Sequence, residues 1–328
     1  MQDENVSLHR FALFTACCTA FLIFVGGLVT STQSGLSVPD WPTSYGWNMF
    51  TFPFSKWVGG IFYEHSHRLV ASTVGFFTVI LTVWTWLKEK RAWVRWLSAA
   101  ALGAVVLQGV FGGLTVIFLL PAWISTVHAC LAQTFFCLVI AIAVVTSPQW
   151  KRGLPQVKPH AESIPLRTLC AMTTAAVYVQ LIMGALMRHT NAGLAIPDFP
   201  LALGHLIPPF SSGKIIIHFA HRVGAVIVTA MMVWTFTRIA RLYSDHSLLF
   251  RPALTMLVLV AVQLTLGAIT IWTAKAVVPT TAHVLTGALI LGTSFLLTLR
   301  AYAMSGAHAD AIARSKDQML IDRVPAWK

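Results

Sequence analysis

Eight apolar runs of about 20 residues each, separated by polar segments, constrain this 328-residue chain more than any other feature. A bilayer core about 30 Å thick needs about 20 apolar residues per helix, and open β-structure cannot satisfy its backbone hydrogen bonds there. Only 10% of the residues are charged, against about 25% in soluble domains. The sequence therefore predicts an all-α, polytopic membrane protein with spans at about 11–31, 62–87, 93–118, 122–146, 167–188, 214–237, 252–274 and 279–300.

The basic residues indicate topology. The formal net charge is +12, but the lysines and arginines fall in short clusters between apolar runs, so we expect no nucleic-acid partner. Cytoplasmic loops of membrane proteins are enriched in such residues. With the N-terminus inside, the inner segments hold 17 of the 23 basic residues. Both termini are therefore expected in the cytoplasm, and the two long loops at about 32–61 and 189–213 outside.

An internal repeat divides the chain. Residues 26–42 and 184–200 are identical at eight of 17 positions at a fixed offset of 158, and further matches follow in the later spans. Each half has an even number of spans, so the two copies should have the same orientation, unlike the inverted repeats of many transporters. The prediction is two parallel-repeat four-helix bundles: an N-terminal half (1–150), a cytoplasmic linker (151–165), a C-terminal half (166–302) and a cytoplasmic tail (303–328).

Four histidines recur through this repeat, near the predicted outer ends of even-numbered spans: His67 pairs with His221, and His128 with His283. Polar residues within a span are costly and usually functional. Two histidines on separate helices of a four-helix bundle suit the axial ligation of haem, whereas zinc takes three or four ligands. The five cysteines form no CxxC motif and lie in apolar runs, where they are expected to be small buried hydrophobes.

Arginines follow the first histidine of each pair. Arg68 and Arg222 are candidates for binding haem propionates, because a guanidinium binds a carboxylate bidentately; the alternative is an arginine that reaches toward the membrane surface. Asp40 and Asp198 lie in Pro-Asp-aromatic-Pro segments and are expected to stabilise turns. The aromatic residues of the first long loop fit an interfacial belt or a lid.

The halves differ three residues before the first histidine, where Glu64 stands in one half and His218 in the other. Residues three apart share a helix face, so Glu64 should lie beside His67. It is a candidate general acid/base or charge stabiliser; the alternative is a structural pairing with Arg68 or His65. The divergence predicts one electron-transfer site and one catalytic site.

Together, the Gly-Leu…Pro-Asp-Trp-Pro loop, Glu64-x-x-His67-Arg68, Thr-Val-His128, His218-x-x-His221-Arg222 and Thr-Ala-His283 resemble the haem A synthase family over nearly all of residues 10–300. The family oxidises haem O to haem A in the bacterial cytoplasmic (inner) membrane or in mitochondria, for cytochrome oxidase. The resemblance implies a multi-pass protein of the bacterial inner membrane. Many bacterial members carry cysteine pairs in the outer loops; these loops have none, so a thiol step cannot apply here.

The resemblance also implies roles for the repeated residues. His221 and His283 would ligate the iron of a bound haem b. Glu64, His67 and His128 would form the haem O site, where the C8 methyl becomes a formyl by successive hydroxylations. A haem O synthase, an electron donor and membrane lipid are the implied partners, and a homo-oligomer is left open. Two alternatives use the same chain: a dihaem b-type electron-transfer cytochrome, which does not need Glu64, and a solute transporter, which the paired histidines disfavour.

Overall fold

The computed structural model describes residues 6–157 and 164–306, and over these ranges it is helical, with two isolated β-bridges and no strand. Eight of the described helices are long and apolar enough to cross a membrane, as predicted. The protein is therefore an all-α, multi-pass membrane protein. These eight helices are α1 (Val6–Ser31), α2 (Gly60–Lys88), α3 (Ala92–Ile117), α4 (Ala122–Thr146), α6 (Leu166–His189), α7 (Gly213–Leu242), α8 (Ser247–Trp272) and α9 (Val277–Met304).

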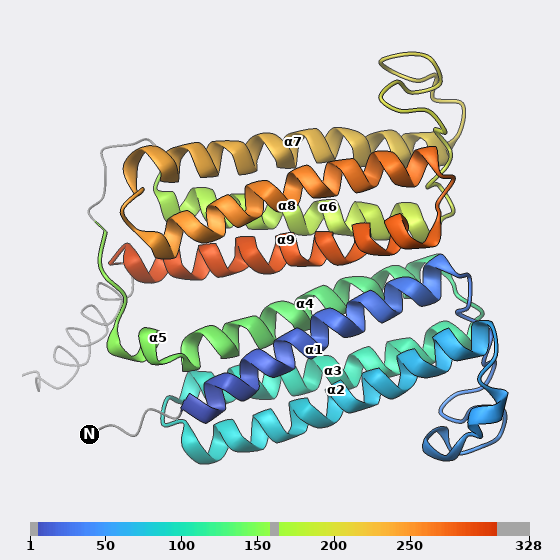
Figure 1. The fold of residues 1–328 in the computed structure, drawn as a ribbon, viewed down its shortest axis with the longest axis horizontal. Helices are drawn as coiled ribbons and strands as arrows, with labels where there is room; N and C mark the ends of the chain where they lie inside the picture. Colours follow the sequence, from blue (N-terminus) through green and yellow to red (C-terminus); the bar gives the residue numbers. More distant parts are fainter. Residues whose placement is uncertain (1–5, 158–163, 307–328) are drawn as a thin grey trace, which may run out of the picture.

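The helices form two groups, α1–α4 and α6–α9, which lie side by side (Figure 1). Each group has its own apolar core. Contacts of α1 and α4 with α6 and α9 join the groups. The two long loops lie at the same end of the molecule, on the right in Figure 1. We call this the loop end. That the groups are parallel copies stays a prediction from the sequence repeat, as do the boundaries of the two halves.

Backbone conformation recurs at the repeat offset. After α3 the chain turns through a left-handed Leu120 (φ 60°), whose N–H donates to the Thr115 carbonyl at 2.7 Å. After α8 it turns through a left-handed Lys275 (φ 68°), whose N–H donates to the Thr270 carbonyl at 2.8 Å. This six-to-one hydrogen bond is a common helix C-terminus. The same termination at positions 155 apart supports the predicted repeat.

The start of α8 differs from the prediction. The sequence placed this span at about 252–274, so that it would begin near Pro252. The helix begins instead at Ser247 and continues through Pro252. Pro252 leaves the Leu248 carbonyl without its helical donor, and Arg300 Nη1 of α9 donates to that oxygen at 3.0 Å. A tertiary hydrogen bond thus replaces the missing backbone bond.

The first span is also longer than predicted. It was expected from residue 11, where continuous apolar sequence begins, but α1 starts at Val6. Leu8 in this first turn is fully buried, and His9 Nδ1 lies 2.8 Å from the Ala143 carbonyl of α4. The added turn is stabilised by packing on α4. A hydropathy pattern carries no information about such contacts.

A short helix, α5 (Pro148–Arg152), follows α4 in the predicted linker region. Its N-terminus is capped by Ser147, whose hydroxyl accepts from the Trp150 N–H at 3.2 Å. No helix was predicted in this segment. The remainder of the predicted linker over 158–163, and the tail from 307 onward, lie outside the described residues.

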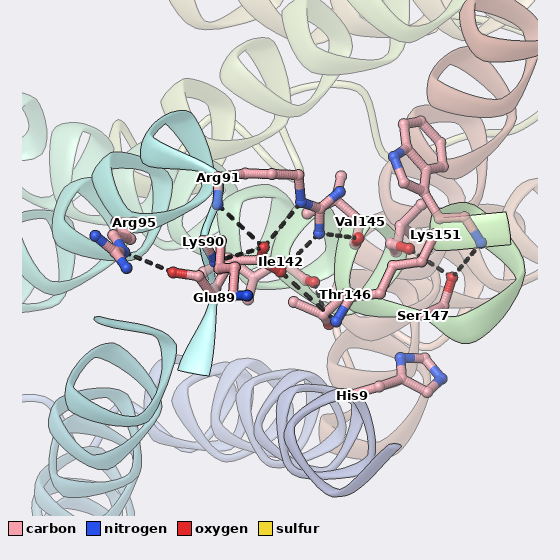
Figure 2. Close-up of polar contacts among 12 residues, drawn as sticks. His9, Glu89, Lys90, Arg91, Arg95, Ile142, Val145, Thr146, Ser147 and Lys151 are labelled. Atoms are coloured by element: carbon pink, nitrogen blue, oxygen red, sulfur yellow. Dashed lines mark hydrogen bonds and ion pairs between the residues drawn. The ribbon is translucent and has the colours of Figure 1, made fainter. Parts of the chain in front are cut away.

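A charged cluster holds the end of the first group opposite the loops (Figure 2). Glu89, directly after α2, accepts two hydrogen bonds from the Arg91 side chain, Nε to Oε1 at 3.0 Å and Nη2 to Oε2 at 2.7 Å. Arg91 also donates to the Val145 carbonyl of α4 at 2.8 Å, and Lys151 Nζ lies 3.7 Å from Glu89. The cluster therefore ties the α2–α3 turn to α4 and α5.

The ionisation of Glu89 follows from these contacts. Burial raises the pKa of its carboxyl group, but the hydrogen bonds and charge of Arg91, with the charge of Lys151, outweigh burial and lower the pKa to about 2. Glu89 is therefore ionised at neutral pH, and its ion pair stabilises the turn only while it remains so.

Candidate functional site

The four repeated histidines lie at the loop end of α2, α4, α7 and α9, and each ring packs against a glycine of the preceding long helix. A Cβ atom built on any of these glycines would lie 3.1–3.2 Å from the ring Cε1. Such contacts are tighter than ordinary packing, so any larger residue would displace the imidazole. The contacts are His67 on Gly26, His128 on Gly112, His221 on Gly184 and His283 on Gly267.

The structure places each predicted pair within one helix group. His67 of α2 and His128 of α4 belong to the first group, and His221 of α7 and His283 of α9 belong to the second. All four histidines are partly buried. Each group therefore presents two imidazoles from two different helices at one end of a four-helix bundle.

A glutamine accompanies the second histidine of each pair. Gln108 Nε2 lies 3.3 Å from His128 Nε2, and Gln263 Nε2 lies 3.2 Å from His283 Nε2. His283 Nδ1 additionally donates to the Gln263 carbonyl at 3.1 Å. That bond fixes the proton on Nδ1 and leaves the lone pair on Nε2, which is the tautomer that ligates a metal through Nε2.

The two groups differ in the hydrogen-bond partners of their histidine Nδ1 atoms. In the second group both have a partner: His283 Nδ1 donates to the Gln263 backbone carbonyl, and His221 Nδ1 accepts from Gln180 Nε2 at 3.1 Å. In the first group the Nδ1 atoms of His67 and His128 are buried and have no hydrogen-bond partner among the described residues. Gln180 was missed by the sequence analysis, although a glutamine within an apolar run was a usable signal.

These residues fit haem. Bis-histidine haem needs two imidazoles from separate helices, an apolar slot and room for rings at fixed angles. The glycine contacts supply that room, and the buried Nδ1 atoms of the first group are polar atoms that a bound group could help to orient. When bound, haem iron would supply the redox chemistry, and His67 with His128, or His221 with His283, would hold it.

In the first group, Glu64 and Arg68 fasten the long loop to α2. Glu64 accepts from the Val38 N–H and from Arg68 Nη2, both at 2.8 Å. Arg68 also donates to the carbonyls of Asp40 at 2.7 Å, Thr43 at 2.9 Å and Val38 at 2.8 Å. We call this arrangement the first latch. The predicted structural alternative, a pairing of Glu64 with Arg68, is therefore present; a role in chemistry remains a proposal.

The second group has an equivalent latch, built from His218 and Arg222. His218 Nδ1 lies 3.3 Å from the Ile196 N–H, and its Nε2 lies 3.2 Å from Arg222 Nε. Arg222 donates to the carbonyls of Asp198 at 2.6 Å and Leu201 at 2.8 Å, and at 3.1 Å to that of Ile196. A neutral imidazole accepts at only one ring nitrogen, so this latch is weaker than the carboxylate latch.

The two loop aspartates stabilise turns, as predicted. Burial raises the pKa of Asp40, but hydrogen bonds from the Gly46 N–H, the Thr43 hydroxyl and the Tyr45 N–H outweigh it and lower the pKa. Hydrogen bonds from the N–H groups of residues 204 and 203 lower the pKa of Asp198. Both carboxylates are therefore turn caps held in the ionised form.

The first long loop also covers the histidine end of its group. Trp41 lies so close to Gly113 of α3 that a Cβ there would be 2.5 Å from the indole ring. Phe52 and Trp57 lie against the His65 ring, with centroids 4.9 and 4.6 Å away. Among the predicted belt-or-lid residues, these three act as a cover, while Phe54 is 79% exposed.

One cation joins the groups. Arg188, at the end of α6, donates from Nη2 to the Gly27 carbonyl at 3.0 Å and to Ser31 Oγ at 2.9 Å, both on α1. Ser31 Oγ in turn accepts from Thr281 of α9 at 3.0 Å. Arg188 was counted only as a topology signal from sequence. Its place in the repeat, where the first half has Thr30, could have marked it as a half-specific contact.

Comparison with known proteins identifies the family. The family model described as "Cytochrome oxidase assembly protein" (COX15-CtaA) matches residues 9–295. A relative named heme A synthase from Halalkalibacterium halodurans is 30% identical over 268 residues, which cover 80% of this chain and 86% of the relative. The chain belongs to the haem A synthase family. Another relative of that name, from Geobacillus kaustophilus, is 27% identical and is covered over 91% of its length, against 89% of this chain.

Membership in the haem A synthase family confirms the resemblance that the motifs indicated. The matched region spans all eight membrane helices, both latches and all four histidines. The family match therefore covers the whole of the candidate site rather than one half of it.

Proposed function

We propose that this protein oxidises the C8 methyl group of haem O to the formyl group of haem A by successive hydroxylations, for the assembly of cytochrome oxidase. Haem O binds between His67 and His128 in the first group, and a resident haem b binds between His221 and His283 in the second. The family match supports the overall activity, and the site geometry supports the division between the two groups.

The observation that carries this division is the different support of the histidine rings. In the second group His283 Nδ1 donates to the backbone carbonyl of Gln263, and an acceptor of this kind orients a ligating imidazole and raises its metal affinity. In the first group neither Nδ1 atom has a partner among the described residues. Pre-oriented ligands suit a cofactor that stays, whereas less constrained ligands suit a substrate that must enter and leave.

Glu64 is the proposed catalytic carboxylate. It lies one helical turn from His67, on the same face of α2. Oxidation of a methyl group creates polar and charged character in an apolar pocket, where a placed carboxylate can stabilise charge or move a proton. The first latch supports this role by holding the carboxylate at a fixed place, with Arg68 2.8 Å away.

Arg68 and Arg222 are proposed to face the haem propionates. Their support is their position, one residue after His67 and His221. Their described hydrogen bonds go mainly to loop carbonyls, so each arginine fixes its loop. The proposed attraction of a propionate is then an effect of charge, stronger for Arg222 than for Arg68, which is paired with Glu64.

The proposed setting is the bacterial cytoplasmic membrane, with both termini inside. A haem O synthase would supply the substrate and a separate electron donor would supply reducing equivalents. The support for orientation is the 17-to-6 division of basic residues. A reporter fused after residue 155 should act in the cytoplasm; activity outside the membrane would contradict the orientation.

The decisive experiment is made in cells that synthesise haem O but no haem A. Expression of this chain should produce haem A, identified by mass after haem extraction. The Glu64→Gln variant should be inserted at the parent level and leave haem O or its alcohol unconverted. Extracts in which the parent chain carries haem B alone would support the dihaem electron-transfer cytochrome instead.

A further inference from the structure

Arg188 is a partly buried cation in the last turn of α6, and only one of its three nitrogens is engaged. Nη2 donates to the Gly27 carbonyl at 3.0 Å and to Ser31 Oγ at 2.9 Å, both on α1. A guanidinium has five N–H donors, so the three on Nε and Nη1 have no acceptor within the described chain. Among the described residues no carboxylate lies within ion-pair distance of Arg188. A charged side chain in a membrane helix is costly and is usually paired.

The two arginines of the latches are more fully occupied. Arg68 donates four hydrogen bonds, three to loop carbonyls and one to Glu64. Arg222 also donates four, three to loop carbonyls and one to the His218 ring. Each latch arginine therefore keeps one of its five N–H donors, whereas Arg188 keeps three. Of these three arginines, Arg188 has the most donors left for a carboxylate at the loop end.

Arg188 is held close to the histidine pair of the second group. It follows Gly184 by one turn of α6 and shares its helix face, and Gly184 packs on the His221 ring. Ser31 Oγ, which accepts from Arg188, also accepts at 3.0 Å from Thr281, two residues before the second histidine of the pair on α9. The guanidinium is therefore fixed at the loop end, beside the turns of α6 and α9 that contact or carry these histidines.

We propose that Arg188 binds one propionate carboxylate of the haem held by His221 and His283, through its donors on Nη1 or Nε. The inference rests on the proposed function, because it assumes haem in the second group. The carboxylates of a porphyrin between these histidines must avoid the apolar bilayer core, so they should point toward the loop end, where Arg188 lies. The repeat places Thr30 at the equivalent position of the first half. A threonine carries no charge, so the contact belongs to the second site.

The contact would hold the haem by a charge-assisted hydrogen bond. Such bonds are about twice as strong as neutral ones, and the loss of one weakens binding by about 10- to 100-fold. The alternative is that Arg188 only joins the two helix groups through α1. The two roles differ in what they retain: a tie between the groups would retain any porphyrin equally, whereas a propionate contact retains only a porphyrin with a free carboxylate.

The test compares iron protoporphyrin IX with its dimethyl ester, which has the same ring but no ionised propionate. The full-length protein with His67→Ala, which removes a ligand of the first site, is purified in detergent from haem-deficient cells and loaded with either porphyrin. Release is followed by transfer to excess apomyoglobin. This protein should release the ester faster than the acid. Adding Arg188→Gln should speed release of the acid by about 10- to 100-fold and leave release of the ester nearly unchanged.

Matched controls separate the contact from the other roles of Arg188. Ser31→Ala removes one bond between the groups and leaves the guanidinium in place, so it should change the release of both porphyrins by the same factor. Lys275→Gln removes an exposed cation from the same end and should leave the ratio of ester to acid release unchanged. In a His221→Ala background loaded with haem O or its dimethyl ester, Arg188→Gln should not alter that ratio.

Several outcomes would overturn the inference. Equal acceleration of both porphyrins by Arg188→Gln would show that Arg188 only joins the groups, and a ratio that changes in Lys275→Gln instead would assign the propionate to another cation. A ratio that changes only in the His221→Ala background would move the contact to the first site. Equal release of acid and ester by the His67→Ala protein itself would contradict the contact even if the Arg188 variant does not fold. A parent protein without low-spin haem would instead refute the proposed function.

Discussion

The two helix groups share their histidine geometry and differ in what surrounds it. In both, a histidine on each of two helices packs on a glycine, a glutamine lies beside the second histidine, and an arginine latch holds the loop. The partners of the Nδ1 atoms and the acceptor of the latch differ. Under the proposed function, the comparison teaches that the residues around the shared histidines, rather than the histidines themselves, distinguish a cofactor site from a substrate site.

The two latches also differ in net charge. Glu64 neutralises Arg68 and accepts two bonds of 2.8 Å. His218 must be neutral to accept from Arg222, so the second latch keeps the full arginine charge. The second latch is therefore more positive than the first, which would favour the carboxylates of the haem b proposed for the second group.

The largest expected effect comes from removing ligands one group at a time. His221→Ala or His283→Ala should abolish nearly all stably bound haem b, because a bis-histidine site loses half of its axial ligation. His67→Ala and His128→Ala should keep haem b and lose haem O binding. Optical spectra and haem extraction of the four purified variants measure both. Equal loss of haem b in all four variants would contradict the division into a cofactor site and a substrate site.

The second effect concerns the diverged latch position. Glu64→Gln should lower haem A formation by about 10²-fold or more, the range typical of a lost acid/base group, while haem b content stays at the parent level. His218→Gln is the matched change in the other group. It should leave haem A formation near the parent rate. Parent-like haem A formation in Glu64→Gln would leave Glu64 with its latch role only.

Sequence predicted the spans and the turn role of Asp40 and Asp198, because these depend on local composition or on the repeat. The ligand role of the histidine pairs stays a prediction. Sequence missed the start of α8, since the bond from Arg300 to the Leu248 carbonyl joins residues far apart in sequence. It also missed Gln180, whose contact with His221 depends on Gly224 of another helix. These features could not be predicted because they depend on how one helix packs on another.

The third expected effect concerns the Glu89 cluster, which lies at the end of the first group opposite the loops. The folded pKa of Glu89, about 2, lies below the usual glutamate value, so its contribution is present above about pH 4.3 and is lost as pH falls toward 2. Glu89→Gln should reduce stability by about 1.5–3 kcal/mol at pH 7. Thermal unfolding in detergent should show a smaller acid-induced loss for the variant between pH 4.5 and 2. Parallel pH profiles would show that the ion pair contributes nothing.

The smallest expected effect concerns the hydrogen bond from Arg300 to Leu248 in the second group, also at the end opposite the loops. Arg300→Gln should cost about 1 kcal/mol, because the Leu248 carbonyl loses its donor. In a Pro252→Ala background the helix regains its own N–H, so the cost of Arg300→Gln should fall. A double-mutant cycle of unfolding midpoints measures this coupling. Additive effects would mean that Arg300 does not compensate for Pro252.

The most direct measurement of the central claim is haem exchange from the parent protein, purified after co-production with a haem O synthase and incubated with excess apomyoglobin. The haems that leave and those that remain are identified by mass. The account predicts that haem O and haem A leave while one haem b per chain remains. Retention of two haem b per chain, with neither exchangeable, would contradict the division into substrate and cofactor sites and support the dihaem cytochrome.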